Sequence, residues 1–141
     1  MKIREVENGV VLEDVKDFEL PHIFECGQCF RWNKQKDDSY IGVANGKVIN
    51  LKKEGSDVYI DNTNRDEMEN IWYNYFDLNR DYGNIKNQLA ELDETMQTSV
   101  KFGHGIRILK QDEWETLVSF IISANNRIPM IKRAIEALSE N

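Results

Sequence analysis

The chain has 141 residues, enough for one ordinary domain or slightly more, and its 40% apolar and 10% aromatic content can fill a hydrophobic core. A net charge of −7 argues against a protein that coats itself in nucleic acid, and no apolar run approaches the roughly 18 residues needed to span a membrane. Two cysteines are too few for a disulfide scaffold, and the charged N-terminus has no signal-peptide core. We therefore expect a cytoplasmic protein, nucleoid-associated if it is bacterial.

The first strands are predicted near the N-terminus. Residues 9–15, with the sequence GVVLEDV, form one candidate strand. A second candidate covers residues 28–32, where alternation places Gln28, Phe30 and Trp32 on one face. Both segments are expected to belong to an antiparallel sheet with one covered face.

Residues 39–62 contain three further predicted strands, separated by two short turns. The first turn is Asn45-Gly46, a pair that favours a type I′ hairpin because both central positions need a positive φ. The second turn is Gly55-Ser56. Together these strands predict an antiparallel meander.

From residue 63 the spacing of apolar residues becomes helical. Asn64 and Glu67 have the spacing of a capping box. An apolar stripe that should pack on the sheet follows at positions i, i+3, i+4 and i+7, formed by Met68, Ile71, Trp72 and Tyr75. Two more helices are predicted over residues 82–92 and 94–102.

The last segment is predicted to form two amphipathic helices. The first begins after Asp112 and runs to about Ala124, and Pro129 suits the first turn of the second. Their apolar stripes are Trp114, Leu117, Val118 and Ile121 in the first helix and Ile128, Ile131, Ile135 and Leu138 in the second. Because two such helices at a terminus have little left to pack against, we expect a longer polypeptide.

Charge is divided unevenly between these regions. Residues 1–100 carry 12 Lys/Arg and 20 Asp/Glu, net −8, whereas residues 101–141 carry 6 and 5, net +1. A site for a polyanion is therefore expected toward the C-terminal end, although ordinary scatter also produces a difference of this size.

Cys26 and Cys29 form a C-x-x-C pair with three possible meanings. A redox dithiol needs its first cysteine at a helix N-terminus, whereas this pair leads into a strand pattern. A structural zinc site needs four ligands, and the other soft ligands are His22 and His104. The third meaning is two small, partly buried residues with no chemical role.

Three stretches together resemble the 8-oxoguanine DNA glycosylases of the helix–hairpin–helix superfamily. They are GQCFRW at 27–32, YFDL at 75–78 and GIRILKQDEWETLVSFIISANNRI at 105–128. The resemblance implies an α+β fold. A twisted antiparallel sheet, similar to that of the TATA-binding protein and packed by helices, would form a lesion-recognition domain at 1–106. The first helices of a helical glycosylase domain would follow at 107–141.

The resemblance assigns lesion binding to Gly27 and Gln28, and it makes the C-x-x-C pair incidental. In the family, the glycine carbonyl accepts a hydrogen bond from the N7 hydrogen that 8-oxoguanine has and guanine lacks. Glycine suits this position because its backbone can approach a ligand closely.

The resemblance also assigns DNA binding to Asn125, Asn126, Arg127 and Met130. Asn125 matches the asparagine that fills the gap left by the flipped base, and Asn126 matches its neighbour, which positions DNA. Met130 stands where the family often carries an arginine that reads the opposite cytosine. Because methionine cannot make those hydrogen bonds, a strict preference for cytosine is not expected.

The family's catalytic residues are a lysine in an L-P-G-x-G-x-K pattern and an aspartate in a V-D-x-H pattern. Neither pattern occurs in these 141 residues, so no catalytic residue is assigned. We expect the N-terminal part of a glycosylase with lyase activity that excises 8-oxoguanine in base excision repair, inactive by itself. Its expected partner is damaged double-stranded DNA, and we expect a monomer with no cofactor, metal or membrane contact.

Two alternatives to this expectation remain open. One is a self-contained, noncatalytic module of the same fold that binds DNA or a partner. The other is the corresponding part of an alkylbase glycosylase, which fits the motifs at 27–32 and 123–128 less well.

Overall fold

A six-stranded antiparallel sheet forms the centre of the computed structural model, which describes residues 1–141. Its strand order is β1-β2-β6-β5-β4-β3. The predicted meander is confirmed for β3 to β6, and an N-terminal hairpin joins it through the pairing of β2 with β6. The strands are β1 (Lys2–Val6), β2 (Gly9–Glu13), β3 (Trp32–Lys34), β4 (Tyr40–Ala44), β5 (Lys47–Glu54) and β6 (Asp57–Asp61).

The predicted turn and alternation are confirmed in the centre of the sheet. Asn45 and Gly46 both have positive φ, 52° and 70°, as a type I′ turn requires. Alternate residues of β5 and β6 are fully buried, namely Ile49, Leu51, Val58 and Ile60. One face of the sheet is therefore covered, as the period of two predicts.

The predicted strand over residues 28–32 is wrong, because regular pairing begins only at Trp32. Residues 25–31 form an irregular turn after the short helix α1 (Leu20–Phe24). Gly27, directly before the predicted strand, has a φ of 87°, outside the extended region of a regular strand, so the backbone bends there.

Neither α1 nor β1 was predicted from the sequence. The helix α1 has five residues, too few to show a 3.6-residue period, and Pro21 lies in its first turn. The strand β1 lies at the edge of the sheet and contains no fully buried residue, so it lacks a clear apolar alternation.

One continuous helical segment after Asn64 covers the sheet. It consists of α2 (Arg65–Glu67), a π-helical turn η1 (Met68–Trp72) and α3 (Tyr73–Tyr75). The Asn64 side chain caps it by accepting a hydrogen bond from the Glu67 N–H at 2.9 Å. The predicted apolar face is confirmed, with Met68 and Trp72 fully buried against the sheet.

Trp32 is the centre of the aromatic core between the sheet and these helices. Its ring stacks on Phe24, with centroids 4.2 Å apart, and its Nε1 donates to the Tyr75 hydroxyl at 3.0 Å. A Cβ built on Gly42 would lie 2.2 Å from the Trp32 ring, so β4 needs glycine at this close approach.

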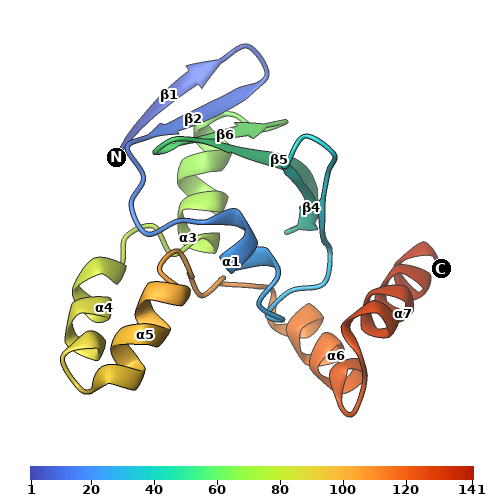
Figure 1. The fold of residues 1–141 in the computed structure, drawn as a ribbon. Coiled ribbons are helices and arrows are strands. Elements are labelled where there is room, and N and C mark those ends of the chain that lie inside the picture. The colour runs from blue at the N-terminus through green and yellow to red at the C-terminus, as the bar shows by residue number, and fades with distance from the viewer.

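Two helical hairpins extend away from the sheet on opposite sides of the molecule (Figure 1). The first joins α4 (Tyr82–Ala90) to α5 (Glu94–Phe102), which confirms the two helices predicted there. The second joins α6 (Glu113–Ser123) to α7 (Ile128–Glu140), also as predicted. None of the helices is long and apolar enough to cross a membrane.

The apolar stripe of α6 is largely uncovered. Trp114 is 72% exposed and Ile121 is 64% exposed, and Leu117 is also exposed. In α7, by contrast, Ile131 and Ile135 are buried. The second hairpin therefore buries apolar residues mainly on α7 and presents an unpartnered apolar face on α6.

Residues 105–111 connect the two hairpins and follow the surface of the sheet domain. Leu109 lies in the main core, and the Lys110 N–H donates to the Tyr75 carbonyl at 2.9 Å. The predicted division between residues 106 and 107 falls inside this segment and stays a prediction.

Candidate nucleic-acid interface

The turn between α1 and β3 exposes the backbone of Gly27. A Cβ added there would meet no atom within 4 Å, and the positive φ favours glycine. The Gly27 carbonyl accepts no hydrogen bond within the chain. It is therefore a backbone acceptor available to a ligand.

Gln28 follows directly, and its side chain bonds only to backbone groups. Its Nε2 donates to the Ile23 carbonyl at 2.9 Å and to the Arg107 carbonyl at 2.8 Å. Its Oε1 accepts from the Leu109 N–H at 3.0 Å. The amide thus links the turn to the connecting segment, and both of its donor hydrogens are used.

A second glutamine strengthens this link. Gln111 donates from Nε2 to the main-chain carbonyl of Gln28. The next residue, Asp112, caps α6 by accepting from the Glu115 N–H at 2.8 Å. The start of α6 is therefore fixed relative to the Gly27 turn.

A cleft of about 270 Å³ lies between the Gly27 turn and the second hairpin. The turn, α6 and the first half of α7 all contribute to its walls. The lining residues are Gly27, Gln28, Phe30, Thr116, Ser119, Phe120, Ser123, Ile128 and Ile131.

The wall that α6 gives to this cleft was not predicted. Thr116, Ser119, Phe120 and Ser123 are spaced at i, i+3, i+4 and i+7, on a different face from the apolar stripe. This hydroxyl-rich spacing is present in the sequence and is the signal that would have located the wall. The Ser119 hydroxyl makes no hydrogen bond within the chain and is available to a ligand.

The loop between α6 and α7 presents two asparagines in different ways. Asn125 has a left-handed backbone, φ 52°, which asparagine tolerates, and its exposed side chain makes no hydrogen bond in the chain. Asn126 donates from Nδ2 to the Ile122 carbonyl and accepts from the Arg127 N–H at 2.9 Å. Asn125 is thus free for a partner, whereas Asn126 shapes the loop.

Of the predicted site residues, Gly27 and Gln28 line the cleft. Asn125, Asn126, Arg127 and Met130 do not line it. They are exposed in the loop and first turn of α7, and the cleft residues Ser123 and Ile128 flank this loop in the sequence. The roles assigned to all six residues stay predictions.

The two cysteines next to Gly27 are free thiols. Cys29 is buried, and burial raises the pKa of its thiol to about 12, which keeps it protonated and unreactive at neutral pH. Cys26 is exposed, with its Sγ 3.5 Å from the Ile23 carbonyl. No group of three or more His, Cys, Asp or Glu side chains is arranged to hold a metal ion.

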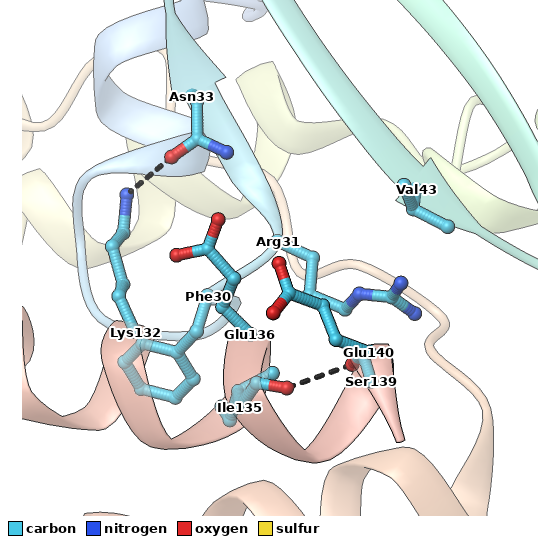
Figure 2. Close-up of a pocket in the computed structure, with 9 residues that line it drawn as sticks. All are labelled: Phe30, Arg31, Asn33, Val43, Lys132, Ile135, Glu136, Ser139 and Glu140. Atoms are coloured by element: carbon cyan, nitrogen blue, oxygen red, sulfur yellow. Dashed lines mark hydrogen bonds between the residues drawn. The ribbon is translucent and has the colours of Figure 1, made fainter.

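Phe30 also lines a second cleft, of about 410 Å³, between the sheet and α7 (Figure 2). Lys132 reaches across it and donates from Nζ to the Trp32 carbonyl at 3.0 Å, with the Asn33 Oδ1 at 3.4 Å. Arg31, Glu136 and Glu140 also line it. With charges of both signs, this cleft is suited to holding α7 against β3 and not to binding a polyanion.

An open antiparallel sheet is covered by helices, and a helical hairpin that follows it forms a cleft with the Gly27 turn, which defines an α+β domain joined to helical structure. Residues 10–117 match the family model described as the N-terminal domain of 8-oxoguanine DNA glycosylase. The chain therefore belongs to the 8-oxoguanine DNA glycosylase family.

Solved structures of the 8-oxoguanine glycosylase/lyase of Clostridium acetobutylicum share this fold. The apo form is 55% identical with a TM-score of 0.89, over 92% of this chain and 45% of the other. The form in complex with double-stranded DNA containing cytosine opposite 8-oxoguanine is 55% identical with a TM-score of 0.91, over 94% of this chain and 45% of the other.

The curated relatives are more distant in sequence. The N-glycosylase/DNA lyase of Saccharomyces cerevisiae is 28% identical over 135 residues, which cover 86% of this chain and 36% of that protein. The chain thus spans about a third of the length of the curated relatives it matches and less than half of the solved structures.

Proposed function

We propose that this chain forms the lesion-reading part of an 8-oxoguanine DNA glycosylase/lyase acting on damaged double-stranded DNA. One observation carries the proposal. The cleft brings the free backbone of Gly27 against α6 and the start of α7, which are far from it in sequence. The motifs at 27–32 and 105–128 therefore contribute to one space.

The chemistry of the Gly27 carbonyl fits the lesion. Oxidation of guanine to 8-oxoguanine turns N7 from a hydrogen-bond acceptor into a donor. A fixed carbonyl accepts a hydrogen bond from the lesion and repels the N7 lone pair of guanine. Since the Gly27 carbonyl has no partner in the chain, it keeps its acceptor capacity for the base.

The exposed loop after α6 supports a role at the DNA gap. The free amide of Asn125 can both donate and accept, so it can bond to the base left unpaired when its partner is flipped out. The adjacent Arg127 is exposed and suited to a phosphate. A monomeric state and a cytoplasmic location stay predictions from the sequence.

The excision chemistry is assigned to sequence outside these 141 residues. The uncovered apolar face of α6 supports this, because further helices of a glycosylase domain would bury Trp114 and Ile121. A covalent imine route needs an activated lysine, and the family's lysine pattern is absent here.

Borohydride trapping on an 8-oxoguanine duplex tests the proposal. The 141-residue chain should give no covalent adduct. The product of the gene read beyond the Asn141 codon should give an adduct with 8-oxoguanine and not with guanine. An adduct with the short chain would show that the nucleophile is misplaced. A reading frame that stops at Asn141, together with nanomolar DNA binding, would favour the noncatalytic module.

A further inference from the structure

We infer that Gln28 is a positioning residue, which aligns the Gly27 carbonyl through the backbone of residues 107–109 and does not contact the lesion itself. The inference rests on the proposed function, since it concerns how the same site is held. Gln111 supports the same turn by donating to the main-chain carbonyl of Gln28.

The Gln28 side chain has no free amide hydrogen left for a ligand. Both amide hydrogens and one oxygen lone pair are bonded, to Ile23, Arg107 and Leu109. All these partners are backbone groups. A base could be bound by the Nε2 group only if one of these bonds were broken, which leaves a backbone carbonyl without its donor.

The Gln28 amide forms a pair of hydrogen bonds with the backbone of residues 107–109. The Gln28 amide donates to the carbonyl of Arg107 and accepts from the N–H of Leu109, two residues later. This is the pattern by which a neighbouring strand would pair with an extended segment. The side chain thus replaces a strand and fixes a segment that has no ladder partner of its own.

The free carbonyl of Gly27 belongs to the peptide group that joins Gly27 to Gln28. Gln28 directly follows this peptide, and both its side chain and its main-chain carbonyl are bonded, the carbonyl to Gln111. Glycine alone would leave the peptide mobile, and these bonds remove that freedom before a base arrives.

The same bonds couple the two walls of the cleft. Residues 107–111 lead directly to Asp112, the cap of α6, and α6 carries Ser119 and Ser123. A change at Gln28 is therefore expected to alter the distance between the carbonyl and α6. Binding to DNA through the Asn125 loop is expected to be less affected.

The test uses three variants of the 141-residue chain. Gln28→Leu removes all three hydrogen bonds at similar volume. Gln28→Glu keeps the acceptor but places a carboxylate against the Ile23 and Arg107 carbonyls, and protonation restores one donor. The matched control is Gln35→Leu, since Gln35 donates to the Asn33 carbonyl at 2.9 Å in an exposed turn.

Two readouts are measured by NMR between pH 8 and pH 5.5. One is the ratio of dissociation constants for duplexes with guanine and with 8-oxoguanine at one position. The other needs no DNA and combines the dipolar coupling of the Gly27–Gln28 peptide with the exchange rate of the Leu109 amide. Wild type and Gln35→Leu should agree in both readouts at every pH.

Gln28→Leu should lose roughly tenfold of the 8-oxoguanine preference at every pH, the scale of one specific base contact. Gln28→Glu should lose it at pH 8 and regain part of it at pH 5.5, with the peptide coupling changing in parallel. A purely stabilising role would weaken binding to both duplexes alike and leave the Gly27–Gln28 peptide coupling of the folded chain unchanged.

The inference is overturned if Gln28→Leu keeps both the preference and the Gly27 peptide coupling. Absence of any preference in wild type would instead contradict the proposed function. In that case the coupling and exchange data still decide whether Gln28 holds the turn.

Discussion

The guanidinium of Arg107 lies 4.6 Å from the centre of the Tyr82 ring and is only 5% exposed. It donates to three backbone carbonyls, those of Lys16, Asp17 and Asp77. A buried cation here is held by carbonyl dipoles and an aromatic face. Because burial disfavours the charged form of the guanidinium, the pKa of Arg107 is lowered from its usual range.

We expect Arg107→Lys to destabilise the chain by about 2–4 kcal/mol, because an ammonium cannot reproduce the planar fork that reaches three carbonyls. Urea unfolding followed by tryptophan fluorescence measures the change. Arg127→Lys, at an exposed site, should change stability by less than about 0.5 kcal/mol. Equal small effects for both variants would show that the buried fork is not needed.

The two thiols are expected to react at very different rates. A thiol reagent at pH 8 should modify Cys26 and leave Cys29 untouched, because Cys29 is buried with its pKa raised to about 12. Unfolding returns that pKa toward about 8.5, so Cys29 should react only in denaturant. Mass spectrometry after labelling counts the modified residues. Rapid loss of both native thiols, or a native disulfide, would restore the redox interpretation of the pair.

Gly42→Ala should destabilise the fold by about 3 kcal/mol or more, since the added methyl would overlap the buried Trp32 ring. Trp32 has no free space to enter, because it stacks on Phe24 and bonds to Tyr75. The matched control is Gly83→Ala in α4, where the nearest atoms are the carboxylate oxygens of Asp17 and Asp81, at 3.2 and 3.3 Å, and no buried ring is overlapped. Thermal unfolding followed by circular dichroism should separate the two variants clearly.

Under the proposed function, Met130 should make excision tolerant of different bases opposite the lesion. A methionine offers only dispersion, whereas Met130→Arg supplies donors to cytosine worth about 1–3 kcal/mol, roughly ten- to a hundredfold in rate. Single-turnover excision opposite each of the four bases measures this preference. Strong cytosine preference in the unchanged protein would assign the readout to residues outside this chain.

The sequence predicts the regular elements well where a single period dominates. Strands β4 to β6 have alternating burial and a turn pair that needs positive φ. The helices α4 to α6 have clear aspartate caps, such as Asp112, and α7 has Pro129 in its first turn. In these segments local propensity and tertiary packing favour the same structure.

The candidate site was predicted less completely, because it depends on side-chain bonds across long sequence separations. The alternation of Gln28, Phe30 and Trp32 suggests a strand, yet Gln28 bonds to residues about 80 positions away. No local pattern contains that information. The hydroxyl-rich face of α6 was overlooked because the apolar stripe beside it is the stronger signal.

We propose that the Gly27 turn reads 8-oxoguanine in the cleft whose opposite wall is α6. Chemical-shift mapping of the 141-residue chain with two duplexes, identical except for 8-oxoguanine or guanine, tests it most directly. We predict that the amide signals of Gly27, Gln28, Ser119 and Ser123 move with the lesion duplex and stay in place with guanine. Asn125 should respond to both duplexes. Identical changes with the two duplexes, or changes confined to other surfaces, would contradict the claim.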